Sequence, residues 1–144
     1  MSQFKRILFP VNGNTHAIEY ALDMAQRSHA KIFLLKTYRL LEEMSKHKAG
    51  DKSLKLSIDE LIEQEFNEKY RPILDKWDVD YELLVEVGFL TDRIISNISE
   101  KKIDMLLLDG LNTNTDEMLL ERFPELKVPV LLIPEPNPNG EPAS

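Results

Sequence analysis

The sequence of 144 residues contains no cysteine. This absence excludes disulfide bonds, thiolate metal ligands and thiol nucleophiles, and it agrees with a reducing, cytoplasmic location. The chain also lacks an excess of positive charge, since 18 lysine and arginine residues against 25 aspartate and glutamate residues give a formal net charge of −7. Because nucleic acids and anionic membranes attract cationic surfaces, neither is an expected partner.

Long hydrophobic runs are absent too. No apolar run approaches the roughly 20 residues that span a membrane, and the first residues lead into a strand-like pattern without the apolar core of a signal peptide. Hydrophobic residues still make up 42% of the chain, which is enough for the core of one domain. Residues 135–144 are rich in proline and contain no apolar anchor. We therefore expect one domain over residues 1–134 and a disordered tail over residues 135–144.

Apolar stretches typical of buried strands alternate with helical patterns along the chain. The expected strands are residues 7–11, 31–38, 81–87, 105–108 and 128–133. The spacing of apolar residues predicts helices from residue 14 or 15, from about residue 54 to 77, from residue 91, and a short one from residue 114 or 115. This alternation predicts the α/β class, with a single doubly wound parallel sheet and helices on both faces.

Local residues indicate where these elements begin and end. We expect Asn14 or Thr15 to cap the first helix and Thr91 to cap the third, because such side chains accept bonds from free backbone N–H groups. Pro72 should kink the second helix or end its first segment. Two glutamates on one side of the strand at residues 81–87 favour a position at or near the edge of the sheet.

Candidate ligand contacts follow the first and fourth strands, because open α/β sheets bind ligands at the carboxyl ends of their strands. Asp109 is either an acid–base or ligand-contacting carboxylate, or it simply makes a turn with Gly110. Asn12 and Gly13 either hold a ligand or only form a turn and a helix cap. Turn formation by itself accounts for Asp109 with Gly110 and for Asn12 with Gly13, and we favour this interpretation.

Other polar clusters give no stronger indication of chemistry. The basic residues Lys46, His47, Lys48 and Lys52 lie on a loop that either folds over an anion or remains solvated, which is the commoner case. The three histidines fall on different elements without the spacing of a zinc site, so no metal is expected. The sequence contains no Walker loop, no Gly-x-Gly-x-x-Gly pattern and no Gly-x-Ser-x-Gly nucleophile elbow.

Four segments resemble the universal stress protein family. They are Arg6–Gly13 (RILFPVNG), Val85–Gly88 (VEVG), Asp104–Gly110 (DMLLLDG) and Val128–Ile133 (VPVLLI). The resemblance implies a five-stranded parallel sheet of order 3-2-1-4-5, the flavodoxin-like order that adenine-nucleotide alpha hydrolases share. It also implies a homodimer formed through the last strand, to which Val128, Val130 and Leu132 would contribute.

Many members of that family bind ATP at the carboxyl ends of the first, second and fourth strands. By position, such a ligand would contact Val11, Asn12, Gly13, Thr37, Asp109 and Gly110. This chain departs from those members, because Asn12 replaces the usual aspartate and the loop pattern Gly-x2-Gly-x9-Gly-Ser/Thr has a threonine at position 113. Glycines let backbone N–H groups approach phosphate oxygens. A degenerate nucleotide-binding site is therefore expected.

These features lead to two main hypotheses. The first is a non-enzymatic regulatory protein of the stress response that needs no cofactor and acts through homodimer and partner contacts or through a small ligand in the residual crevice. Asp109, Asp116 and Glu117 favour it, because they would repel a triphosphate. The alternative is a nucleotide-binding protein or weak ATPase that holds ATP or AMP with a rearranged phosphate loop. A flavodoxin-type redox domain is disfavoured, because no phosphate loop of Ser/Thr and Gly follows the first strand.

Overall fold

The structure is a computed structural model and describes residues 4–11, 15–39, 54–109 and 121–134. The strands are β1 (Arg6–Pro10), β2 (Lys31–Tyr38), β3 (Tyr81–Val87), β4 (Met105–Asp109) and β5 (Val130–Ile133). The helices are α1 (Thr15–Ser28), α3 (Leu54–Leu74), α4 (Leu90–Glu100) and the short 3₁₀ helix η1 (Phe123–Glu125). The order of strands and helices along the described chain agrees with the alternation that the sequence predicts.

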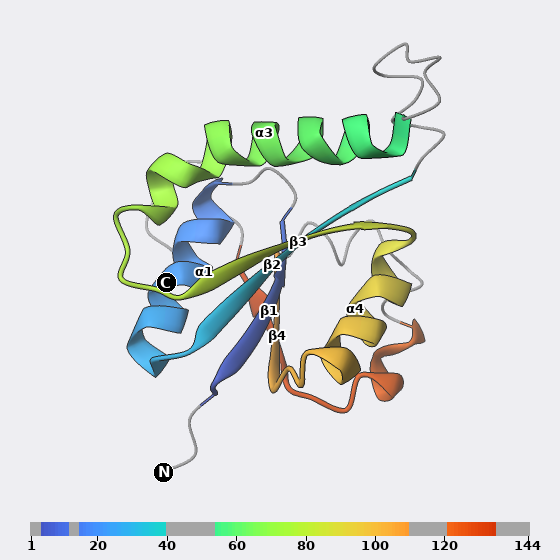
Figure 1. The fold of residues 1–144 in the computed structure, drawn as a ribbon. Helices are drawn as coiled ribbons and strands as arrows, with labels where there is room; N and C mark the ends of the chain where they lie inside the picture. Colours follow the sequence, from blue (N-terminus) through green and yellow to red (C-terminus); the bar gives the residue numbers. More distant parts are fainter. Residues whose placement is uncertain (1–3, 12–14, 40–53, 110–120, 135–144) are drawn as a thin grey trace.

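The five strands form one parallel sheet in the order β3-β2-β1-β4-β5. This topology confirms the predicted fold class and the predicted order 3-2-1-4-5. Strand β1 lies in the centre, where Leu8 pairs with Phe33 of β2 and with Leu106 of β4. Strand β3 lies at one edge, as its glutamates indicate, and β5 lies at the other. Figure 1 shows α1 and α3 on one face of the sheet, and α4 with η1 on the opposite face.

Alternation of side chains along the strands divides the core between these two faces. On one face, Ile7 of β1 belongs to a buried cluster with residues of α1 and with Phe66 of α3. On the other face, Leu8 belongs to a cluster with Ile94 of α4. Because both faces of the central strands are covered, the carboxyl edge of the sheet remains the place for a ligand site. None of the described helices combines the length and apolarity that crossing a membrane requires.

The predicted cap of the third helix is wrong. Helix α4 begins at Leu90, and its N-cap is Phe89, which has extended backbone angles (φ −79°, ψ 141°) and makes no side-chain cap bond. Thr91 lies in the first turn and is buried. The cause is Gly88, which has a φ of +137° and turns the chain as soon as β3 ends. A Cβ at this position would lie 3.2 Å from Cδ of Arg93, so both the backbone angle and the space favour glycine.

Pro72 does not end α3 at once. The helix continues through Pro72 and ends at Leu74, so Trp77, which the apolar pattern includes, follows the helix. Residues 68 and 72 are exposed. The backbone bond that proline removes therefore falls on an exposed part of the helix, in its last turn, where proline is tolerable.

The last strand begins two residues later than predicted. Pro129 has no N–H for the ladder, and its carbonyl accepts a bond from the N–H of Leu106 at 2.9 Å; the strand itself starts at Val130. Thr15, one of the two residues predicted to cap the first helix, is the first residue of α1. Three predicted features lie outside the described residues. They are the cap at residue 14, the helix start at residue 114 or 115, and the loop at residues 40–53.

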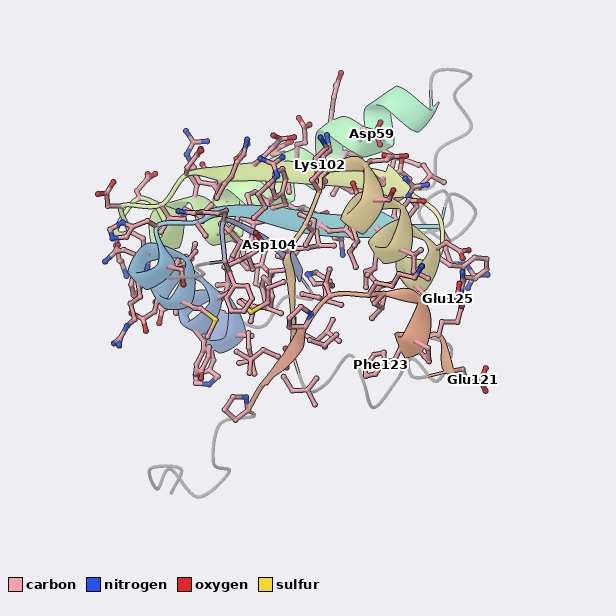
Figure 2. The ribbon with its side chains drawn as sticks, turned by 90° about the horizontal axis from the view of Figure 1, so that it is seen from below. Asp59, Lys102, Asp104, Glu121, Phe123 and Glu125 are labelled. Atoms are coloured by element: carbon pink, nitrogen blue, oxygen red, sulfur yellow. The ribbon has the colours of Figure 1, made fainter. Side chains whose placement is uncertain are left out.

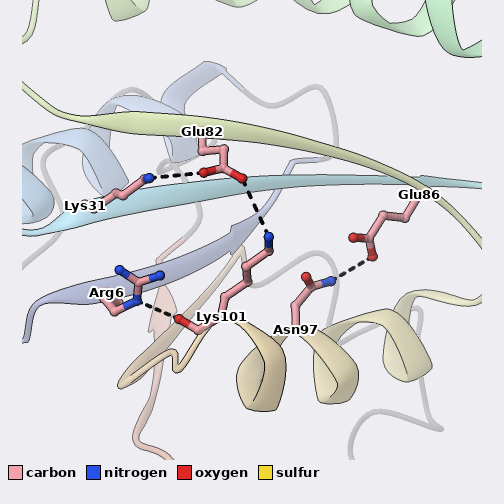
Figure 3. Close-up of polar contacts among 6 residues, drawn as sticks. All are labelled: Arg6, Lys31, Glu82, Glu86, Asn97 and Lys101. Carbon is pink, nitrogen blue, oxygen red and sulfur yellow. Dashed lines mark hydrogen bonds and ion pairs between the residues drawn. The ribbon is translucent and has the colours of Figure 1, made fainter.

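Ion pairs join β2, β3 and the end of α4 at the amino edge of the sheet (Figure 3). Glu82 of β3 receives Lys31 Nζ at 3.1 Å on one carboxylate oxygen and Lys101 Nζ at 3.8 Å on the other. The Nε of Arg6 donates to the carbonyl oxygen of Lys101 at 2.6 Å. The hydrogen bond from Lys31 holds the pKa of Glu82 below its usual value of 4.5, and the positive charges around it act in the same direction.

Replacing Glu82 with glutamine is expected to destabilise the protein near neutral pH and to have little effect in acid. A carboxylate with a depressed folded-state pKa stabilises the fold above its unfolded pKa, and this contribution is lost as the pH falls through the folded pKa. The difference in Tm between the wild type and Glu82→Gln should therefore shrink below pH 4.5. Thermal melts from about pH 7 to about pH 3 measure it, with Glu100→Gln on the exposed end of α4 as control. A difference that persists unchanged in acid would contradict this role.

Candidate functional site

Three of the predicted site residues lie in the described part of the chain, and all three lie at the carboxyl edge of the sheet. Val11 directly follows β1, Thr37 is the penultimate residue of β2, and Asp109 ends β4. The N–H of Val11 donates to the carbonyl of Leu35 at 2.9 Å, which holds the end of β1 against β2. The other predicted site residues, Asn12, Gly13 and Gly110, lie outside the described residues.

The three described residues do not share one face of the sheet. Val11 belongs to the buried cluster on the α1/α3 face. Leu107 of β4 belongs to the same cluster, so Asp109, two residues further along the strand, points to that face as well. Leu35 of β2 belongs to the cluster on the α4 face, and Thr37 therefore points to the opposite side. The structure brings Val11 and Asp109 to one side and separates Thr37 from them.

Asp109 is enclosed by the protein. Only 1% of it is exposed, and its neighbour across the ladder, Ile133 of β5, is buried too. Burial of a carboxylate is costly unless other groups pair with it, and Asp109 is among the residues that do have an interaction partner. The residue therefore does not present its carboxylate to solvent, and the turn that it would make with Gly110 lies outside the described residues.

A small, partly open cavity lies on the α1/α3 face, between α3 and the carboxyl ends of β1 and β2. Its volume is about 140 Å³. The lining residues are Val11 and Lys36 from the sheet side, and Ile62, Glu65, Phe66, Lys69 and Tyr70 from α3. Pockets for drug-sized ligands usually measure about 300–1,000 Å³, so this cavity suits a smaller molecule.

Sequence reasoning missed the two lysines of this cavity. The signal for Lys36 was present, because Ile32 and Leu34 precede it at the spacing of one strand face and are both buried. A lysine at the next position of that face is unusual, since the position calls for an apolar side chain. No signal pointed to Lys69, because only the packing of α3 on the sheet brings it to the cavity.

A second polar cluster fastens β3 to α4 on the opposite face, next to Thr37 in the strand register. Glu86 Oε1 accepts bonds from Arg93 Nε at 2.8 Å and from Asn97 Nδ2 at 2.7 Å; Figure 3 shows the Asn97 contact. Asn97 Nδ2 also donates to the carbonyl of Arg93 at 2.8 Å. Among the described residues, Asn97 Oδ1 is a buried acceptor without a hydrogen-bond partner. The cluster joins two secondary structure elements, and its polar groups face one another.

The described residues contain no group of three or more histidine, aspartate or glutamate side chains arranged to hold a metal ion. Of the histidines, His16 lies in α1 and His29 directly follows it, whereas His47 lies outside the described residues.

Comparison with known proteins decides the family. The sequence model of the universal stress protein family matches residues 3–120 of this chain. The chain belongs to that family. A comparison with curated proteins finds no match. The match covers most of the sheet described above, together with the predicted site residues at its carboxyl edge.

Solved structures of other universal stress proteins share the fold of this one. UspA from Lactobacillus plantarum superposes with a TM-score of 0.68 at 15% identity, covering 93% of this chain and 100% of the other. A family protein from Arabidopsis thaliana with AMP bound gives 0.58 at 18% identity, covering 96% and 97%. The universal stress protein from Archaeoglobus fulgidus in complex with dAMP gives 0.61 at 13% identity, covering 92% and 100%. At these identities, the likeness concerns the fold alone.

Proposed function

We propose that this universal stress protein is a non-enzymatic regulator of the cytoplasmic stress response that does not bind ATP through a glycine loop. It acts as a homodimer through partner contacts and through a small ligand in its residual crevice. The observation that carries the proposal is the composition of the segment after β4, where the chain between Asp109 and Val128 contains one glycine, Gly110. Polyphosphate loops rely on several glycines so that successive N–H groups can turn toward the oxygens.

The position of η1 supports this proposal. With the family spacing counted from Gly110, the third glycine and the following hydroxyl residue would fall at Phe123 and Pro124. Both residues are part of η1, and Phe123 packs against the buried cluster around α4. Figure 2 shows Phe123 and Glu125 on this short helix beside α4. A partly buried aromatic side chain thus stands where the family pattern has a glycine, whose bare backbone could approach a phosphate.

The charge of this region supports it as well. The first basic residue after β4 is Arg122, and two carboxylates already engage it. Its Nη1 donates to Asp92 at 2.6 Å, and its Nε donates to Glu125 at 2.9 Å. The hydrogen bond to Glu125 has the larger effect on the pKa of Arg122 and raises it, and the hydrogen bond to Asp92 raises it further. A phosphate at this loop would have to compete with both carboxylates for the guanidinium group.

The second candidate function is binding of a nucleoside monophosphate. It is favoured by the structures with the same fold that contain AMP or dAMP. A single phosphate needs fewer backbone donors than a triphosphate, so the missing glycines weigh less against it. The cavity that the described residues form beside Val11 would not itself hold a nucleotide, because its volume of about 140 Å³ lies below the range usual for ligands of that size.

A thermal-shift panel of ATP, ADP, AMP and cyclic AMP with Mg²⁺ tests the proposal. Ligand at 100 times its dissociation constant stabilises a protein by about 2.7 kcal/mol, which raises the Tm of a domain of this size by roughly 5–10 °C. We expect no shift with any of the four nucleotides. A shift with ATP would overturn the proposal. A shift with AMP but not with ATP would establish the second candidate.

A further inference from the structure

The cavity beside Val11 has the size of one six-membered ring. Its volume is about 140 Å³, and an apolar cavity of about 150 Å³ is known to hold one benzene molecule. Ile62, Phe66 and Tyr70 form its apolar wall on the α3 side, and all three are buried. The rings of Phe66 and Tyr70 lie 5.0 Å apart at an angle of 47°. An aromatic ring entering the cavity would pack against apolar and aromatic side chains.

Two cations border this apolar space. Lys36 reaches it from β2, and Lys69 reaches it from α3, while Glu65 is the one carboxylate among the lining residues that the structure describes. The Nζ of Lys69 lies 5.9 Å from the centre of the Tyr70 ring, so its charge sits beside the wall of the cavity. The charge of these described lining residues is positive on balance, in contrast to the net charge of −7 for the whole chain. Such a combination is complementary to a ligand with an apolar ring and one negative charge.

Lys36 gives the strongest indication that the ligand carries a negative charge. It is half-buried on a face of β2 whose preceding residues, Ile32 and Leu34, belong to the core. Within the described residues, no carboxylate forms an ion pair with Lys36. Partial burial of an ammonium group without an anion carries a desolvation cost. A ligand carboxylate would supply the missing counter-charge.

We propose that this cavity is a binding site for a small monocyclic aromatic carboxylate, with the ring against Phe66 and Tyr70 and the carboxylate between Lys36 and Lys69. This inference deepens the proposed function, because it names the class of small ligand to which a protein without a phosphate loop would respond. Benzoate is the simplest probe of the class. For a molecule of this size we expect a dissociation constant on the order of 0.1 mM.

A series of ligands measures the contributions of the ring and of the charge to binding separately. Benzoate is titrated into the ¹⁵N-labelled full chain and followed by NMR, with backbone shifts expected along α3 around Ile62, Phe66 and Tyr70. Benzamide keeps the ring but removes the charge, and acetate keeps the charge but removes the ring. Each should bind at least about tenfold more weakly, as the loss of one charge-assisted contact or of one buried ring predicts. 1-Naphthoate should bind more weakly than benzoate, because its second ring exceeds the volume of the cavity and would project into water.

Matched lysine variants test the site. Lys36→Met and Lys69→Met remove a charge and keep an unbranched apolar stem, and each should weaken benzoate binding about tenfold. Lys76→Met, on the exposed turn after α3, should leave it unchanged. Circular dichroism and Tm confirm that all three variants fold. If a lysine variant unfolds, the comparison of benzoate with benzamide on the wild type still tests whether binding depends on the ligand charge.

Three outcomes would overturn the inference. They are no benzoate binding at about one hundred times the expected dissociation constant, equal affinity for benzamide, and unchanged affinity in the Lys36→Met variant. ATP is included in the same series. Nucleotide binding that persists in Lys36→Met while benzoate fails would overturn both this inference and the proposed function. Failure of benzoate with no response to ATP would overturn this inference alone.

Discussion

Replacing Phe33 with alanine is expected to lower the free energy of unfolding by about 4 kcal/mol, because a large ring would be removed from the interior. Phe33 lies in β2 and is 1% exposed, and it belongs to the buried cluster between the sheet and α4. Two cations lie over its ring as well, with Arg6 Cζ at 4.9 Å and Lys31 Nζ at 5.0 Å from the ring centre. Because Arg6 and Lys31 are themselves partly exposed, their attraction to the ring adds about 0.5–1 kcal/mol each. Urea unfolding at neutral pH measures the loss.

Phe89→Ala is the matched control for this prediction. Phe89 also has a cation over its ring, since Arg39 Cζ lies 4.8 Å from the ring centre, but the residue is 52% exposed. Burial is therefore the main difference between the two phenylalanines, and Phe89→Ala should cost less than about 1 kcal/mol. Similar losses in both variants would mean that the face of the sheet against α4 is not the closely packed core that its burial indicates.

Most of the fold could be predicted because the strand pattern is strong. The limits of β2 and β3 agree with the predicted residues 31–38 and 81–87, since apolar stretches end there at loop residues and at Gly88. The cap at Thr91 could not be predicted by residue type. Threonine is a good cap, but the backbone of Gly88, with its φ of +137°, starts the helix earlier. Residue type gives a preference for a helix start, whereas the preceding turn decides it.

Less of the candidate site could be predicted. Strand order placed Val11, Thr37 and Asp109 at one edge of the sheet, which is a property of parallel topology. Their separation onto two faces follows from strand alternation, but it depends on where each strand ends to within one residue. Lys69 could not be found at all from the sequence, because its place at the cavity depends on how α3 packs across β1 and β2. Contacts between distant segments determine the site, and local patterns do not encode them.

The homodimer remains a prediction, and the structure supplies a sharper way to test it. Strand β5 is an edge strand, and Leu132, one of the predicted interface residues, is 49% exposed. Val128 and Val130 are partly buried against the cluster around α4, so they can contribute less to an interface. Leu131, which the prediction did not include, is exposed as well. Deleting the strand would be a poor test, because Ile133 is buried in the core and its loss would destabilise the monomer.

Leu132→Lys is therefore expected to convert the dimer into a folded monomer. A two-fold axis places the substitution twice in one interface, and burial of an unpaired charge costs several kcal/mol, so the dissociation constant should rise at least about a hundredfold. Val87→Lys, on the opposite edge strand and 38% exposed, is the matched control and should leave the dimer intact. Sedimentation equilibrium measures both variants, and circular dichroism confirms their folding. A dimer that survives Leu132→Lys but dissociates in Val87→Lys would place the interface on β3, and a monomeric wild type would remove the homodimer from the proposed function.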